Sequence, residues 1–168
     1  KTMVKEWLYS ILSTEKNIVR SPKSYNSQLG VPLSLLQIKK STDFAIIEVG
    51  ISKLGEMQKF FDLINPDYTI CTSFYSEDDL SRKALNDEFL KLFYNVKKGV
   101  IYGEHSHGFL DNKIDIVTRN ENEFVSFFKN TNKEPVFKRN AMIAAQAALA
   151  VGMSKEKIGE ALSNLPSL

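Results

Sequence analysis

The chain has 168 residues, of which 43% are hydrophobic and 25% are charged, as in an ordinary globular domain. This length can bury one sizeable core and predicts a single domain over residues 1–168. The formal net charge is only +2, and Lys and Arg are interleaved with Asp and Glu, which argues against a nucleic-acid partner. No stretch approaches the roughly 18 to 20 apolar residues of a membrane helix, so we expect no membrane partner.

The single cysteine, Cys71, excludes an intrachain disulfide and is typical of a small buried side chain in a reducing compartment. We therefore expect a cytoplasmic protein. The sequence opens on Lys1-Thr2 directly before a helical pattern, with no initiator methionine and no signal peptide, which predicts a fragment of a longer protein.

Segments with apolar residues at helical spacing alternate with short apolar runs that are typical of strands. In chain order, the patterns predict a helix over 4–12, a strand over 17–19, a helix over 33–38, a strand over 44–49, a helix over 55–64, a strand over 68–72, a helix over 79–95, a strand over 99–102, and helices over 140–151 and 154–165. This alternation predicts an α/β fold with a mostly parallel sheet and helices on both faces. The strand over 44–49 is expected to be buried on both faces. Within the more polar residues 103–135 we expect edge strands or loops.

Two places carry residues that are typical of nucleotide chemistry. Lys1-Thr2 matches the end of the phosphate-binding pattern G-x-x-x-x-G-K-[ST], in which the lysine reaches phosphates and the hydroxyl binds Mg²⁺; the alternative is an ordinary helix start capped by Thr2. Glu48 ends an apolar run at the sheet edge where ligands of open α/β folds bind, and a carboxylate there can hold Mg²⁺. Alternatively, Glu48 marks the point where the strand emerges into water.

Two other polar groups favour structural interpretations. His105 and His107 have the i,i+2 spacing of possible zinc ligands, but the sequence nearby does not complete a ligand set, which favours a solvated loop. The acidic run 77–79 is typical of a helix N-terminus, where negative charge is favourable.

Three blocks of the sequence, read together, resemble the central domain of the Mur ligases. They are KTMVKEWL over 1–8, SPKSYNSQLGVPLS over 21–34 and IEVGISKLGEM over 47–57. Asn140-Ala141, with the alanine-rich helix up to Gly152-Met153, is similar to the family's stretch that closes the nucleotide site, so the resemblance covers nearly the whole chain. It implies a three-layer, P-loop-like α/β fold, with an N-terminal substrate domain and a C-terminal domain outside residues 1–168.

Within the family, the likeness is to ligases that add D-alanyl-D-alanine to UDP-MurNAc-tripeptide in peptidoglycan synthesis, especially a Bacteroidetes-type form fused to an alanine racemase. The resemblance implies that ATP phosphorylates the substrate's carboxylate and that an amine then attacks the acyl phosphate to give an amide. ATP and Mg²⁺ are the implied cofactors. UDP-MurNAc-peptide and D-alanyl-D-alanine are the implied substrates of the complete protein.

The resemblance also implies roles for individual residues. Those roles are ATP phosphate binding and catalysis for Lys1, phosphate and Mg²⁺ binding for Thr2, Mg²⁺ binding and catalysis for Glu48, Mg²⁺ binding for Asp78, proximity to adenine for Asn140, and contact with the UDP-MurNAc-peptide for Ser24, Asn26, Ser27 and Gln28.

The chain departs from the family's pattern on the metal side of the site. Ser73 and Glu77-Asp78 stand where the family has Asn and an Ala-His pair, although Asp78 retains an oxygen ligand for Mg²⁺. Phe89 stands where the family carries a lysine that is often carbamylated. A shifted register would nominate Lys83 or Lys91 for that position.

A further departure is Val136-Phe137, which stands where the family has a His-Asn pair before the helix that carries Asn140. These departures leave an alternative function open: a non-catalytic, Mur-ligase-like binding or scaffold domain of a fused ligase and racemase protein. For the isolated 168 residues we predict weak or no ATP binding, because the glycine-rich half of the phosphate loop is missing from them.

Overall fold

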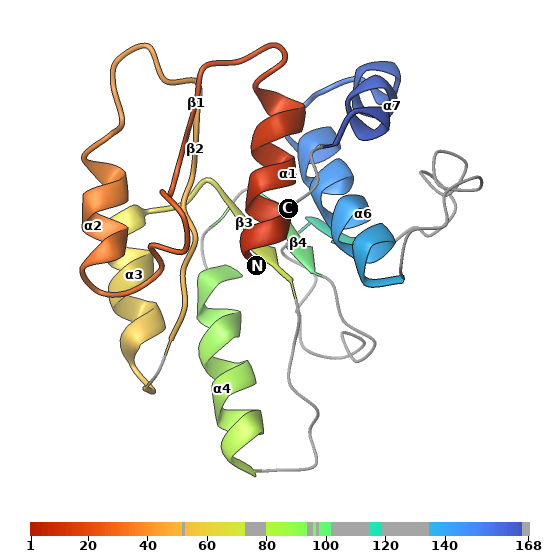
Figure 1. The fold of residues 1–168 in the computed structure, drawn as a ribbon. Coiled ribbons are helices and arrows are strands. Elements are labelled where there is room, and N and C mark those ends of the chain that lie inside the picture. The colour runs from red at the N-terminus through yellow and green to blue at the C-terminus, as the bar shows by residue number, and fades with distance from the viewer. Residues whose placement is uncertain are drawn as a thin grey trace.

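Helices and strands alternate along the chain in a computed structural model that describes residues 1–51, 53–72, 80–93, 96, 98–101, 115–118 and 135–165 (Figure 1). The elements in chain order are α1 (Thr2–Leu12), β1 (Ile18–Arg20), α2 (Gly30–Leu35), β2 (Phe44–Ile46), α3 (Glu56–Ile64), β3 (Tyr68–Cys71), α4 (Leu80–Leu90), the 3₁₀-helix η1 (Lys91–Phe93), β4 (Lys98–Ile101), β5 (Asp115–Thr118), α6 (Pro135–Ala150) and α7 (Lys155–Ser163). Every predicted helix and strand has a counterpart here, with bounds that differ by a few residues. None of the described helices is long and apolar enough to cross a bilayer.

All strand pairs in the described residues are parallel. β1 pairs with β2, with Ile18 opposite Phe44. A second sheet has the order β3-β4-β5, with Tyr68 opposite Lys98 and Lys98 opposite Asp115. The prediction of a mostly parallel sheet is therefore confirmed. Among the described strands, β5 lies at the edge of its sheet, in line with the edge strands or loops expected within the polar segment 103–135. Apart from β5 and Pro135, that segment, including His105 and His107, lies outside the described residues.

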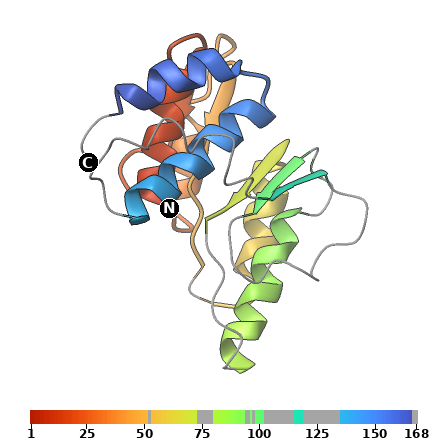
Figure 2. The same ribbon diagram turned by 90° about the vertical axis from the view of Figure 1, so that its right-hand side faces the viewer.

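Two apolar cores lie on opposite faces of the strands, which gives three layers (Figure 2). Because successive side chains of a strand point to opposite faces, Ile70 packs against one core while Cys71 belongs to the other. The first core is built from α1, α6 and α7, and the second from α2, α3, α4 and η1. The predicted α/β fold with helices on both faces is confirmed, and so is the burial of Cys71.

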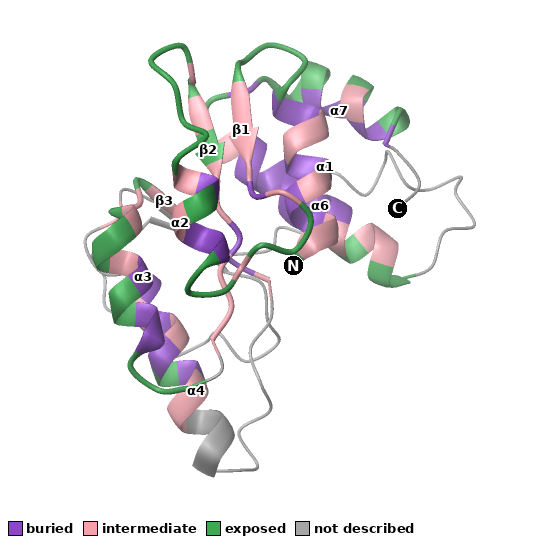
Figure 3. Cartoon of the chain, turned by 60° about the vertical axis from the view of Figure 1, so that its left-hand side comes forward, coloured by how far each residue is buried: buried purple, intermediate pink, exposed green. Residues whose placement is uncertain are grey.

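The larger core is centred on the contact between α1 and α6, whose facing sides are buried (Figure 3). Alanines fill this side of α6, and their small side chains let the two helix backbones approach closely; the fully buried ones are Ala141, Ala144, Ala145 and Ala148. Trp7 of α1 is also fully buried, and its ring lies 4.4 Å from the Phe137 ring, centroid to centroid. The N-terminus of α1 is thereby held beside α6.

A cavity of about 410 Å³ is lined by β2 and β3, which belong to different sheets, and by α1 and α6. β2 is consequently less buried than predicted: Phe44 and Ile46 are half-buried and Ala45 is exposed. Ile46 packs against the first core, and Ile47 and Val49 pack against the second, so both faces of the run over 44–49 are partly covered. One edge of β2 has no hydrogen-bonded strand neighbour among the described residues, and the strand is therefore less buried than predicted.

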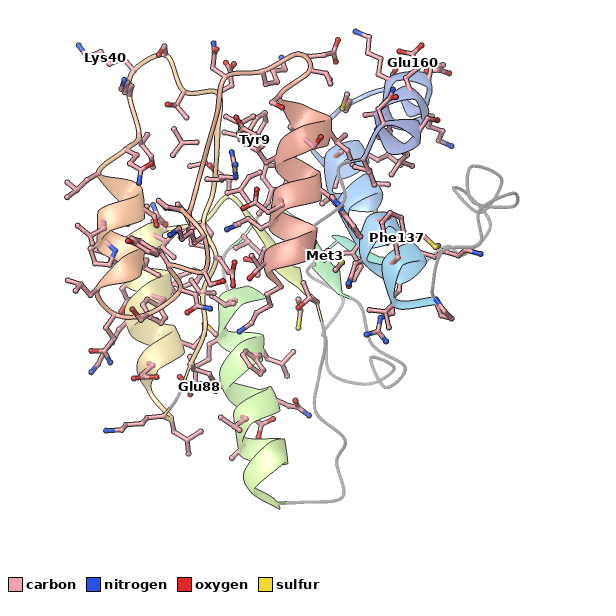
Figure 4. The ribbon with its side chains drawn as sticks, viewed as in Figure 1. Met3, Tyr9, Lys40, Glu88, Phe137 and Glu160 are labelled. Carbon is pink, nitrogen blue, oxygen red and sulfur yellow. The ribbon has the colours of Figure 1, made fainter. Side chains whose placement is uncertain are left out.

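The start of α3 depends on a carboxylate from another helix. Glu88 of α4 is buried, and its Oε1 accepts hydrogen bonds from the backbone N–H groups of Gly55 (2.9 Å) and Met57 (3.0 Å). Lys91 Nζ lies 2.6 Å from the other oxygen, Oε2. Figure 4 shows Glu88 on the side of α4 nearest α3. Burial alone would raise the pKa of Glu88, but the hydrogen bonds from Lys91, Gly55 and Met57 outweigh it and lower the pKa below the ordinary glutamate value of 4.5.

Replacing Glu88 by Gln should lower the free energy of unfolding by about 1.5–3 kcal/mol, because the hydrogen bonds to a charged acceptor are lost. Because the folded-state pKa is depressed, the stabilisation by Glu88 is complete above pH 4.5 and declines as the pH falls below that value. Urea denaturation at pH 7 and at pH 3 measures both effects. A difference between Glu88→Gln and the parent that is the same at both pH values would contradict this assignment.

Candidate functional site

Three segments meet where the two parallel strands β1 and β2 end. The loop after β1 and the segment after β2 run side by side: Ser21 N–H donates to Ile46 O (3.0 Å), Glu48 N–H to Ser21 Oγ (2.9 Å) and Gly50 N–H to Asn26 O (2.9 Å). The first bond continues the parallel ladder of β1 and β2, whereas the other two replace regular strand pairing. This change of partners explains why β2 ends at Ile46 and not at Val49 as predicted. The N-terminus of α1 is the third segment.

Glu48 is the centre of this meeting point, and only 6% of its surface is exposed. Its Oε1 accepts hydrogen bonds from Thr2 Oγ1 (3.1 Å) and Asn26 Nδ2 (3.1 Å), and Ser24 Oγ lies 3.2 Å from the same Thr2 hydroxyl. The structure therefore brings together four predicted site residues from three segments. It contradicts the alternative in which Glu48 marks the point where the strand emerges into water.

Lys1 and Thr2 begin α1 beside Glu48. The N-cap position belongs to Lys1, and Thr2 is the first helical residue, so the alternative of Thr2 as an ordinary cap is wrong. Lys1 Nζ approaches Val49 O (3.5 Å). A Cβ atom on Gly50 would lie 3.2 Å from Lys1 Nζ and 3.4 Å from the Asn26 amide, so glycine leaves room for both groups.

Lys5 is a residue of this site that the sequence analysis missed. Its side chain is 4% exposed, and its Nζ donates to Ser21 O (2.8 Å) and to Lys23 O. The same Nζ lies 3.1 Å from Glu6 Oε1 and 3.6 Å from Glu48 Oε2. Residues four apart on a helix lie on the same face. The position of Lys5 one turn after Lys1 could therefore have placed it near the site from the sequence.

The remaining residues predicted to contact substrate, Ser27 and Gln28, form hydrogen bonds that support neighbouring helices. Ser27 Oγ accepts a hydrogen bond from Gly30 N–H (3.3 Å) at the start of α2. Gln28 Nε2 donates to Glu56 Oε1 (2.8 Å) at the start of α3. Within the described part of the chain, the side-chain hydrogen bonds of these two residues go to Gly30 and Glu56 and not to the Glu48 group, so their role in substrate binding stays a prediction.

Asn140 lies on α6, at its contact with the first turn of α1. Its Nδ2 is 3.3 Å from the sulfur of Met3, the residue after Thr2; Figure 4 labels Met3 and Phe137 at this contact. Asn140 is therefore adjacent to the first turn of α1, although its proximity to adenine stays a prediction. Val136 is half exposed, and Phe137 belongs to the helix contact through Trp7.

The positions at which the chain departs from the Mur pattern are only partly described. Ser73 and Asp78 lie outside the described residues, as does the side chain of Lys83. Phe89 is half-buried and packs against the second core, whereas Lys91 is engaged with Glu88. Phe89 and Lys91 thus stabilise the packing of α4 and η1 against α3.

The donor set around Glu48 fits Mg²⁺. A buried carboxylate and the hydroxyls of Thr2 and Ser24 are hard oxygen donors within one hydrogen-bonded group. Among the residues with described side chains, no three His, Cys, Asp or Glu groups cluster as a complete metal cage. Mg²⁺ commonly binds through one or two carboxylates together with phosphates of a substrate, and this arrangement supplies that protein contribution.

Comparison with known proteins gives the family. Residues 1–148 match the model of the Mur ligase middle domain. The chain belongs to the Mur ligase family. The resemblance based on the three sequence blocks is thus confirmed at the family level.

Curated relatives and solved structures show which Mur ligases the chain is similar to. The chain is 24% identical to UDP-N-acetylmuramoyl-tripeptide–D-alanyl-D-alanine ligase of Bacillus subtilis, over 98% of this chain and 42% of the relative. It is 30% identical to the enzyme of the same name from Buchnera aphidicola subsp. Acyrthosiphon pisum, over 80% of this chain and 30% of the relative. A crystal structure of MurF from Acinetobacter baumannii has the same fold, with a TM-score of 0.81 at 19% identity, over 99% of this chain and 44% of that one. The chain thus spans less than half the length of these proteins.

The loop that carries Ser24 and Asn26 depends on Gly30. A Cβ atom there would lie 2.8 Å from the backbone carbonyl carbon of Tyr25, which cannot move without displacing the loop. We expect Gly30→Ala to lower the free energy of unfolding by about 1–3 kcal/mol, measured by chemical denaturation. Leu36→Ala, at an 81% exposed position directly after α2, is the control and should stay within about 0.5 kcal/mol of the parent. Equal stability of the two variants would refute the steric argument.

Proposed function

We propose that the complete protein is an ATP-dependent amide ligase of peptidoglycan synthesis, and that residues 1–168 are its central ATP-binding domain. It adds D-alanyl-D-alanine to UDP-MurNAc-tripeptide. Family membership and the names of the relatives support the reaction. The observation that carries the proposal is the hydrogen bond between Thr2 at the N-terminus of α1 and the buried carboxylate of Glu48.

The start of α1 binds the phosphates of ATP. The first N–H groups of a helix have no partner within it, and the helix dipole favours negative charge at this end. Lys1 adds a cationic side chain at the same place, and its ammonium is kept close to Val49 O by the absence of a side chain on Gly50. Glycine-rich residues directly before Lys1 would complete the phosphate loop, so sequencing that segment is a direct check.

Thr2 and Glu48, whose hydroxyl and carboxylate are hydrogen-bonded to each other, are the residues that would hold Mg²⁺. When bound, the ion neutralises negative charge on the phosphoryl group that is transferred to the substrate's carboxylate. Ser24 and Asn26 contact the same two side chains, so we assign them to this side of the site as well as to the UDP-MurNAc-peptide. Asp78 remains a further candidate ligand from sequence.

The phosphoryl transfer brings together two anions, ATP and the substrate's carboxylate, so positive charge and positioning supply most of the rate enhancement. Lys1 supplies charge, and the α1, 21–26 and 48–50 segments supply positioning. ATP use is consistent with the cytoplasmic location expected from the sequence. The Bacteroidetes-type form and the fused alanine racemase stay predictions.

Calorimetry on the complete protein should detect ATP binding that depends on Mg²⁺. Glu48→Gln removes the charge that holds the metal and should lower the rate of amide formation from UDP-MurNAc-tripeptide and D-alanyl-D-alanine by about 10²-fold. Asp62→Asn, which alters an exposed carboxylate on α3, is the control and should keep the parent rate. Absence of Mg²⁺-dependent ATP binding in the parent would leave the alternative, a non-catalytic Mur-ligase-like domain.

Gly50→Ala tests the position of Lys1. The added methyl group meets Lys1 Nζ at 3.2 Å and forces the ammonium to shift, so we expect the Kd for MgATP to rise about tenfold. The KM for D-alanyl-D-alanine should stay unchanged, because the substitution acts on the phosphate side. Ile51→Val, which adds no atom next to Lys1, is the matched control, and an equal rise in its Kd would show that the effect is not specific to Gly50.

A further inference from the structure

The most unusual side chain near the site is Lys5, because lysine is almost never fully buried unless it is paired. Its ammonium has three N–H donors. Two of them reach the carbonyl oxygens of Ser21 and Lys23, which belong to the loop that presents Ser24 and Asn26. The third lies toward Glu6 Oε1, at 3.1 Å. Lys5 is therefore saturated by contacts that fix its position.

Glu6 is itself anchored from the opposite side. Arg20 Nε at the end of β1 lies 2.8 Å from Glu6 Oε2, and the Arg20 guanidinium lies 3.6 Å from the centre of the Tyr9 ring. Glu6, a residue of α1, is thus tied to the end of β1 as well. The ammonium forms a fixed positive charge and has little freedom to turn away.

The two oxygens of Glu48 face different surroundings. Oε1 accepts the hydrogen bonds from Thr2 and Asn26. Oε2 is buried, accepts no hydrogen bond within the described part of the chain, and lies 3.6 Å from Lys5 Nζ. Because shorter contacts occupy the donors of Lys5, its interaction with Oε2 is one of charge. A second cation at Oε2 would be repelled at close range.

We propose that Lys5 is a positioning residue that leaves only Oε1 of Glu48 open to a metal ion and thereby favours Mg²⁺ over Ca²⁺. Mg²⁺ accepts a single carboxylate oxygen within a small octahedral shell, whereas Ca²⁺ takes more ligands and often binds both oxygens of one carboxylate. The inference rests on the proposed function for the identity of the metal. The coupling between Lys5 and Glu48 does not depend on it.

The coupling between Lys5 and Glu48 is tested without metal, by a double-mutant cycle on the complete protein. Lys5→Gln keeps two N–H donors for the loop carbonyls but removes the positive charge. The factor by which it raises the unfolding equilibrium constant should be at least about ten times larger in the parent background than in the Glu48→Gln background. Lys5→Met provides a second cycle if Lys5→Gln does not fold. Lys16→Met, at an exposed position after α1, should not couple to Glu48→Gln. Additive effects of the Lys5 and Glu48 substitutions would overturn the proposal.

Metal preference is tested by the affinity of a non-hydrolysable ATP analogue, measured by calorimetry with Mg²⁺ and then with Ca²⁺. In Lys5→Gln the ratio of the two affinities should move about tenfold toward Ca²⁺, and Lys5→Arg, which retains the charge, should restore it. An unchanged ratio in folded Lys5→Gln would refute the role in selectivity. If the parent binds no nucleotide with either metal, the proposed function fails, while the unfolding cycle still decides whether Lys5 acts through Glu48.

Discussion

A carboxylate that is buried loses its hydration, and hydrogen bonds or opposite charge from the protein must make up for that loss. The structure around the site follows from how this is done for Glu48. Thr2 from α1 and Asn26 from the loop after β1 donate to one oxygen, and Lys5 places a positive charge beside the other. Each compensating group comes from a different part of the chain or a different turn of α1. Burial of one carboxylate thereby ties together the N-terminus of α1, the loop over 21–26 and the segment that follows β2.

The same contacts shape the backbone. Ser21 accepts a hydrogen bond from Glu48 N–H through its hydroxyl, and Asn26 accepts one from Gly50 N–H through its carbonyl. The chain after Ile46 therefore leaves the strand and follows the loop, which turns the Glu48 side chain toward α1. Gly30 and Gly50 have no side chains at the two places where another group approaches closely, the Tyr25 backbone and the Lys1 ammonium. Fold and site geometry are in this way products of the same bonds.

Periodicity predicted the order and type of the helices and strands, because each amphipathic helix covers a strand that has its own apolar pattern. It overestimated the burial of β2, since an apolar run does not reveal whether a strand has a neighbour at each edge, and β2 has only β1 among the described residues. For the site, the start of α1 and Glu48 followed from local motifs. Lys5 was missed because a lysine among apolar helix positions looks solvated in sequence, and its partners, two carbonyl groups of a distant loop, are visible only in three dimensions. Ser27 and Gln28 stand beside Asn26 in sequence, yet they support α2 and α3.

Contacts within the protein itself organise the site. The hydrogen bonds from Thr2 and Asn26 to Glu48 Oε1 hold the hydroxyl, the amide and the carboxylate in one group, and a metal ion would take the place of these donors at the same oxygen. Lys5 cannot be exchanged in this way, because its ammonium is committed to Ser21, Lys23 and Glu6. The replaceable contacts thus lie on the Oε1 side and the permanent ones on the Oε2 side. Such a division keeps the loop and α1 in place while a ligand enters, so little ordering of the protein remains to oppose binding.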